Sequence, residues 1–254
     1  MLTAAAIAAA DPGPFGSDLS VVECTGSTND DLVRAARLGA PAGRTLVAEE
    51  QTRGRGRLGH AWHSPAGTNL HLSVLLRPSR VEIESVPVLA LVACVAVAEA
   101  VMETAALPAR LKWPNDVLID GRKVSGILAE IADTSPLALV VGVGINVNVR
   151  FFPPDLESIA TSIFRETGRD TDRAVLAAAM LRGMHRRFEE AEQGGLASVL
   201  ERWRTLSSTI GRIVRTADGL EGRAVDVDPT GALLVTDASG EIHSVVGGQI
   251  REIG

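Results

Sequence analysis

The chain has 254 residues, 46% of them hydrophobic and 22% charged, which is ordinary for a globular protein and enough for a large domain plus a small one. Its net charge of −6 argues against a protein that binds nucleic-acid phosphates through an overall basic surface. The two cysteines, Cys24 and Cys94, lie far apart without metal-ligand spacing, so we expect no disulfide framework and a reducing, cytoplasmic setting.

The first twenty residues are rich in alanine and lack the basic start of a signal peptide, so we expect a flexible leader or a short helix. A short strand, Val21 to Glu23, follows. The polar turn Ser27-Thr28-Asn29 then opens a helix that ends at Gly39. Thr28 with Asp31 resembles a capping box, but free amides at a helix start can equally bind a polar ligand.

A strand from Thr45 to Glu49 leads into a loop of alternating arginine and glycine, QTRGRGRLGHAW, at residues 51–62. Glycines allow the backbone to bend tightly, and guanidinium groups match planar anions with paired hydrogen bonds. The loop therefore predicts a phosphate or carboxylate site. A mobile basic loop and an RNA-binding segment are the alternatives, although an aromatic content of only 3% offers few platforms for bases.

The alternation in Leu70–Leu76 predicts a strand with one buried face, and Ser85–Ala106 predicts a central apolar helix. Its most apolar run, Val88–Ala98, is too short to span a bilayer and predicts a buried helix, so we expect no membrane association. Arg110 to Trp113 forms a short strand that Pro114 interrupts.

Asp120-Gly121 is a strong hairpin signal between strands Val117–Ile119 and Arg122–Ile131. A regular two-residue turn would place Leu118 opposite Lys123 and Asp116 opposite Ser125. Asp116 and Lys123 then share one face as diagonal neighbours about 7 Å apart. They either converge on an anionic ligand or form a simple cross-strand ion pair.

Leu137 to Asn148 predicts a further strand, in which Gly142 and Gly144 suggest that a ligand approaches the backbone closely. The proline-rich residues 150–162 predict a mobile loop over the site. Helices from Asp170 or Thr171 to Gln193 and from Leu196 to Leu206 follow. From about Ser208, short strands between close turns predict a small all-β barrel or sandwich.

Three stretches, AEEQTRGRGRLGHAWHSPAGTNLHLS, LKWPNDVLIDGRKVSGILAE and VGVGINVN, strongly resemble the biotin–protein ligases in sequence, order and spacing. The resemblance implies an α+β fold: a mixed-sheet catalytic domain, similar to class II aminoacyl-tRNA synthetases, with helices on one face and a C-terminal SH3-like barrel. It implies a leader at 1–20, a catalytic domain at 21–207 and the barrel at 208–254. The short leader would leave no room for the DNA-binding domain of some relatives.

The implied reaction has two steps. Biotin and ATP, with Mg²⁺, give biotinyl-AMP and pyrophosphate, and the biotinyl group then passes to a lysine of a biotin carboxyl carrier protein. The family contains monomers and homodimers. A lipoate–protein ligase or a lipoyl/octanoyl transferase of the same fold is the alternative enzyme, and stimulation of pyrophosphate exchange by biotin rather than lipoate would separate them.

The resemblance also implies site residues. Ser27, Thr28, Asn29, Gln51, Gly54, Arg55, Arg57, Trp62, Lys123, Gly126 and Gly142 would bind biotin, and Arg55, Arg57, Trp62, Asn69, Lys112, Trp113, Asn115, Lys123 and Asn146 would bind the nucleotide. Lys123, Arg55, Arg57 and Asp116 would be catalytic, with Asp116 also supporting Mg²⁺. His60 departs from the family's usual arginine or lysine. We therefore expect His60→Arg to slow the loss of biotinyl-AMP.

Overall fold

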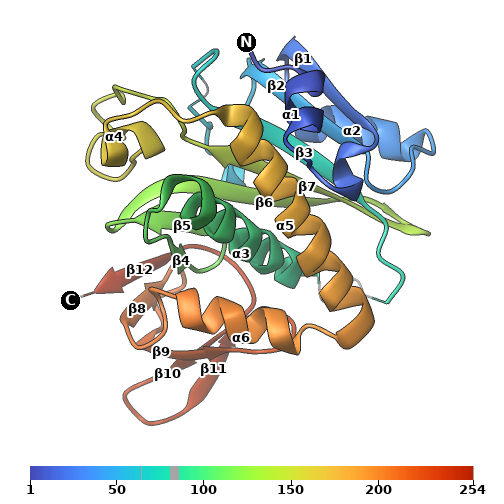
Figure 1. Cartoon of the computed structure of the whole chain (residues 1–254). Helices are drawn as coiled ribbons and strands as arrows, with labels where there is room; N and C mark the ends of the chain where they lie inside the picture. Colours follow the sequence, from blue (N-terminus) through green and yellow to red (C-terminus); the bar gives the residue numbers. More distant parts are fainter. Residues whose placement is uncertain (64, 81–85, 254) are drawn as a thin grey trace.

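The computed structural model describes residues 1–63, 65–80 and 86–253, which form a large mixed sheet with a smaller sheet beside it (Figure 1). The large sheet has the strand order β1-β2-β3-β7-β6-β5-β4. Only the β1–β2 pair is parallel, so the prediction of a mixed sheet is confirmed. The strands are β1 (Leu19–Thr25), β2 (Thr45–Gln51), β3 (Leu70–Leu76), β4 (Arg110–Lys112), β5 (Asp116–Ile119), β6 (Arg122–Thr134) and β7 (Leu137–Ile145).

Helices α3 (Val86–Ala105) and α5 (Arg173–Gly194) pack together over one face of this sheet and bury the main core (Figure 1). The predicted first residue of α3, Ser85, lies outside the described residues. Helix α3 is long and apolar enough to cross a membrane, but most of its side chains are buried in this core. Shorter helices are α4 (Ile163–Thr167) and α6 (Ala197–Leu206), with 3₁₀ turns at Pro14–Gly16 and Arg57–Gly59.

The expectation of helices on one face only was wrong. Helix α2 (Thr28–Arg37) lies on the opposite face, where Leu32 and Ala36 pack against Leu75 and Val140. Strand β3 is therefore buried on both faces rather than one. The polar residues His71 and Ser73 alternate with apolar ones and so suggested a solvent-facing side, but both are fully buried.

The first twenty residues contain a helix that folds onto the core, which confirms the short-helix alternative of the sequence prediction. Helix α1 (Ala4–Ala9) packs on α5 through Ile7, and Phe15 is also buried. The backbone amide of Leu2 donates a hydrogen bond to Glu49, a buried carboxylate at the end of β2. The alanine-rich composition gave no sign of this anchoring because few apolar side chains carry it.

The hairpin between β5 and β6 is confirmed, with positive φ values of 49° at Asp120 and 76° at Gly121. Leu118 opposes Lys123 as predicted. Asp116, however, opposes Gly126 and not Ser125, because a β-bulge shifts the register by one residue.

The C-terminal strands form an antiparallel five-stranded sheet of order β11-β10-β9-β8-β12, which confirms the predicted small β unit. Its strands are β8 (Ile213–Thr216), β9 (Glu221–Val227), β10 (Leu233–Thr236), β11 (Ile242–Val245) and β12 (Ile250–Ile253). The indole nitrogen of Trp113 donates to the carbonyl of Gly231 at 3.0 Å, joining this sheet to the large one.

Candidate active site

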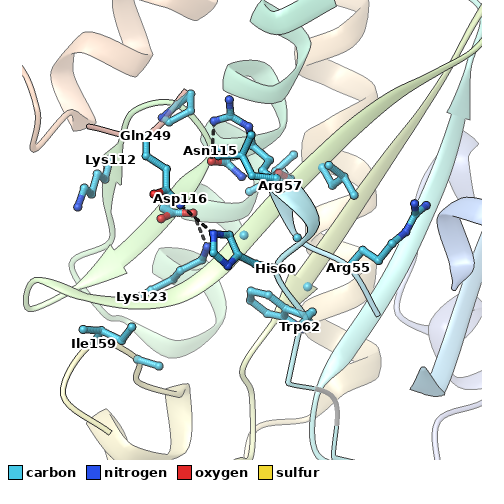
Figure 2. A pocket seen from close by; sticks show the side chains of 18 of the residues that line it. Arg55, Arg57, His60, Trp62, Lys112, Asn115, Asp116, Lys123, Ile159 and Gln249 are labelled. Carbon is cyan, nitrogen blue, oxygen red and sulfur yellow. Dashed lines mark hydrogen bonds and ion pairs between the residues drawn. The ribbon is translucent and has the colours of Figure 1, made fainter. Parts of the chain in front are cut away.

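A cavity of about 1110 Å³ opens on the α2 side of the large sheet (Figure 2). Most residues that the sequence singled out line it: Ser27, Thr28, Asn29, Gln51, Arg55, Arg57, Trp62, Lys112, Trp113, Asn115, Asp116, Lys123, Gly126, Gly142 and Asn146. Gly54 and Asn69 are buried without forming part of the lining. The structure therefore brings nearly all the predicted positions to one place.

The start of α2 forms the polar end of the cavity. Ser27, rather than Thr28, caps the helix, since its hydroxyl accepts from the amide of Asp30 at 3.5 Å. The amide and hydroxyl of Thr28 both donate to Oε1 of Gln51, at 2.8 and 3.0 Å. This arrangement fixes the Gln51 amide beside the N-terminus of α2. A small polar ligand could form hydrogen bonds with both the side-chain amide and the helix N-terminus there.

Two further residues, which the sequence analysis missed, hold Asn29 in place. The buried hydroxyl of Ser73 lies 2.6 Å from Oδ1 of Asn29 and 2.7 Å from the hydroxyl of Thr28. The amide of Asn29 donates to Glu130 at 2.6 Å. Both supporting residues come from strands far from Asn29 in sequence, so their only local signal is a polar residue inside an apolar strand.

Glycines form the floor of the cavity. A Cβ atom at Gly142 would lie 2.1 Å from the side chain of Asn29, and one at Gly144 would lie 2.5 Å from the ring of Trp62. A Cβ at Gly126 would lie 2.9 Å from Cε of Lys123. In this structure the protein's own side chains approach these glycines closely, and the approach of a ligand stays a prediction.

Lys123 and Asp116 form the ionic centre of the cavity. The Nζ atom of Lys123 lies 2.5 Å from Oδ1 of Asp116 and 5.5 Å from the centre of the Trp62 ring. Figure 2 marks the ion pair between Lys123 and Asp116 with a dashed line. The predicted sharing of one face is confirmed. The Lys123 backbone pairs with Ile159 and Thr161, so the proline-rich segment lies beside the site as predicted. Its mobility stays a prediction.

The two loop arginines have different surroundings. Arg55 forms ion pairs with Asp30 and Glu130 at the rim and points away from Lys123 (Figure 2). Arg57 donates to Oδ1 of Asn115 at 3.3 Å. Burial lowers the pKa of Arg57, and the charge of Asp116 offsets part of this effect. The guanidinium nevertheless stays cationic, because arginine is not deprotonated in proteins. Arg57 is the better placed of the two to meet an anion.

Asn146 and Lys112 also line the cavity. Asn146 is 4% exposed and donates to the carbonyl of Thr161 at 3.1 Å. The predicted wall residue Trp113 is only 2% exposed, and its ring is fixed by the bond to Gly231. Trp113 thus anchors the two sheets as well as touching the cavity.

The C-terminal sheet also reaches the cavity, which the sequence analysis did not predict. Arg215, Thr216 and Gln249 line it, and Gln249 contacts His60 of the arginine–glycine loop. No local motif marks these residues, because their role depends on how the small sheet packs against the large one.

Comparisons with known proteins agree with this geometry. Residues 21–148 match the model of the biotin/lipoate A/B protein ligase family, and residues 209–250 match the biotin protein ligase C-terminal domain. A biotin–[acetyl-CoA-carboxylase] ligase of Mycobacterium tuberculosis is 37% identical over 91% of this chain and 88% of its own. The bifunctional ligase/repressor BirA of Bacillus subtilis is 34% identical over 89% of this chain and 71% of its own.

Among solved structures, the biotin protein ligase from Aquifex aeolicus in complex with biotin and ATP superposes with a TM-score of 0.83. It is 30% identical, and the match covers 93% of this chain and 100% of that one.

Proposed function

This chain belongs to the biotin/lipoate A/B protein ligase family, and we propose that it is a biotin–protein ligase. It activates biotin with ATP and then transfers the biotinyl group to a carrier protein of a biotin-dependent carboxylase. The observation that carries this proposal is the single cavity that joins the polar end at Thr28 and Gln51 to the cationic centre at Lys123 and Arg57.

The polar end suits the ureido group of biotin. That group has two N–H donors and one carbonyl acceptor. The hydroxyl oxygen of Thr28 can accept from one of the donors, and the hydroxyl of Ser27 and the amide nitrogen of Gln51 can donate to the carbonyl. Asn29, held by Ser73 and Glu130, borders the same space.

In the first step a carboxylate oxygen of biotin attacks the α-phosphorus of ATP, and the bond to pyrophosphate breaks. Two anions must approach, so cationic side chains lower the barrier as charge builds on the phosphoryl oxygens. Lys123 and Arg57 are placed to supply this charge, and Lys112 can contact the outer phosphates. Asn69, Asn115 and Asn146 would complete the nucleotide site, with Asn146 reading adenine.

In the second step the neutral amine of the acceptor lysine attacks the acyl carbon of biotinyl-AMP, and AMP leaves. Asp116 lies at the reacting centre and can accept the amine proton. Arg55, bound to Asp30 and Glu130, would fasten the arginine–glycine loop over the intermediate and so help to exclude water. Gly54 and Trp62 complete the loop, where the Trp62 amide donates to the Gly54 carbonyl at 3.0 Å.

A magnesium ion fits this site. Mg²⁺ is usually held by one or two carboxylates together with substrate phosphates, and Asp116 offers one carboxylate beside the cationic centre. When bound, the ion would neutralise phosphate charge. We also propose the domain division at residue 208 and a cytoplasmic setting, in which the free cysteines Cys24 and Cys94 stay reduced.

Exchange of labelled pyrophosphate into ATP tests the proposal. We expect biotin, and not lipoate, to stimulate exchange, and the enzyme then to label a biotin carrier domain. Stimulation by lipoate alone would instead assign the chain to the lipoate branch of the family.

A further inference from the structure

A buried ion pair joins the end of β2 to the start of α5. Both carboxylate oxygens of Glu49 accept from the guanidinium of Arg173, at 2.7 and 3.1 Å. The side chains are only 7% and 10% exposed. Removing two charges from water costs free energy, which the pair recovers only if its geometry is good. A buried ion pair of this kind is therefore weak evidence for stability, and its other contacts indicate what it holds in place.

The same guanidinium also holds Asn69, which lies outside the cavity lining but contacts Asn146 of the proposed nucleotide site. Arg173 donates to the backbone carbonyl of Asn69 at 3.0 Å. The amide of Asn69 donates in turn to the carbonyl of His63 at 3.2 Å and to Oδ1 of Asn146 at 3.4 Å. Among the described residues, the buried Oδ1 of Asn69 has no hydrogen-bond partner. The position of the Asn69 side-chain amide therefore depends on the two hydrogen bonds that its nitrogen donates and on the backbone that Arg173 fixes.

A second tether runs from the residues just before α5. The Asn148 amide donates to the carbonyl of Thr171 at 3.0 Å, and the Thr171 amide donates back to Asn148 at 2.9 Å. The backbone amide of Asn148 also donates to Thr68 at 2.8 Å. The start of α5 thus holds both chain segments that carry Asn69 and Asn146.

We propose that Arg173 is a positioning residue for the nucleotide base, acting through Asn69 on Asn146. The inference rests on the proposed function, in which Asn146 contacts adenine. Adenine offers an N–H donor beside a ring acceptor, and an amide matches both only when its orientation is fixed. Arginine can hold two carboxylate oxygens and a carbonyl at once, whereas the ammonium of lysine is a compact charge without this planar fork.

The test compares ATP with GTP in biotin-dependent pyrophosphate exchange by wild type and Arg173→Lys. We expect the KM for ATP to rise about tenfold and the preference for ATP over GTP to fall by a similar factor. The dissociation constant of biotin, measured without nucleotide, should stay within about twofold, because the contacts of Thr28 and Gln51 are untouched. Glu49→Gln removes the charge from the other partner of the ion pair and should also lower the preference for ATP over GTP.

Arg182→Met is the matched control. Arg182 also lies on α5, pairs with Glu103 at 3.2 Å and donates to the carbonyl of Ala10 at 3.0 Å, but it contacts neither Asn69 nor Asn148. It should leave the preference for ATP unchanged. Thermal unfolding of each variant shows that it is folded.

If folded Arg173→Lys keeps the wild-type preference for ATP over GTP in pyrophosphate exchange, the inference is overturned. An equal loss of affinity for biotin and for ATP would also overturn it. Wild-type protein without biotin-dependent exchange would instead overturn the proposed function, so the two failures are distinct.

Discussion

The side-chain nitrogen of Gln249, from the C-terminal sheet, lies 3.1 Å from Nε2 of His60, at the tip of the arginine–glycine loop (Figure 2). A Cβ atom at the neighbouring Gly247 would lie 3.7 Å from the guanidinium of Arg57. The small sheet therefore contacts the loop at His60 and lies close to Arg57. Contact between the C-terminal sheet and the arginine–glycine loop closes one side of the cavity.

The first prediction concerns this contact. Gln249→Ala should speed the release of biotinyl-AMP about fivefold, because a neutral hydrogen bond of about 1 kcal/mol no longer holds the loop to the small sheet. Displacement of bound intermediate by excess unlabelled ligand measures the rate. Gln193→Ala is the control, since Gln193 is an exposed amide bonded to Glu189 on α5. Equal release from the Gln249 variant and wild type would show that the contact does not matter.

The second prediction concerns the ionic centre. Lys123→Ala should lower the rate of biotinyl-AMP formation by about 100-fold or more, since a positioned cation near developing phosphate charge is lost. Single-turnover formation of biotinyl-AMP measures this step. Arg122→Ala removes the adjacent cation, which pairs with Glu166 at 2.7 Å, and should have little effect. Similar rates for Lys123→Ala and wild type would remove Lys123 from the catalytic set.

The third prediction concerns loop closure. Trypsin can cut after Arg53, Arg55 and Arg57, so cleavage in this loop reports how often it opens. Biotin with ATP should slow cleavage about tenfold if the loop closes over the intermediate. Cleavage after the exposed Arg169, between α4 and α5, provides the internal control. If both sites are cut at unchanged rates with ligand, the loop is a static site.

The fourth prediction concerns His71, which is fully buried on β3. Burial lowers its pKa from 6.5 to about 4, although the backbone of Ala48 favours the charged form slightly. The unfolded chain therefore binds a proton between pH 6.5 and 4 that the folded chain excludes. The free energy of unfolding should fall as pH drops through this range, by about 3 kcal/mol in total, and should be unaffected by His71 above it.

Urea unfolding between pH 7 and 4 measures this slope for wild type and His71→Phe. Phenylalanine is of similar shape and does not titrate, so its curve should be flatter over this range. Neither ring nitrogen of His71 meets hydrogen-bond geometry with a described residue, so the substitution removes no well-formed bond. Parallel curves would show that His71 is not the group responsible.

Local sequence signals predicted the chemistry of the site well. The hairpin turn at Asp120 and Gly121 is enough to place Lys123 near Asp116, because both lie within a few residues of it. The start of α2 was found in the same way, from its polar turn. Contacts of this kind depend on backbone geometry over short distances, which residue type largely determines.

The supporting residues could not be predicted, because their contacts are distant in sequence. Ser73 looked like the solvent side of a strand, yet it is fully buried under α2. Glu130 acts only where β6 meets α2, and Gln249 acts only where the small sheet meets the arginine–glycine loop. A period-two pattern shows which residues share a face, but not whether another element covers that face.

The bulge in the β5–β6 hairpin sets a constraint on evolution and engineering. Because Val124 is an extra residue, Lys123 and Gly126 lie on the same face although they are three positions apart. Deleting Val124 would leave Lys123 and Gly126 two positions apart and still on one face, whereas one more residue between them would send Gly126 to the opposite side of the sheet. This hairpin should therefore tolerate many substitutions on its core side, and even loss of the bulge residue, while resisting an insertion between Lys123 and Gly126.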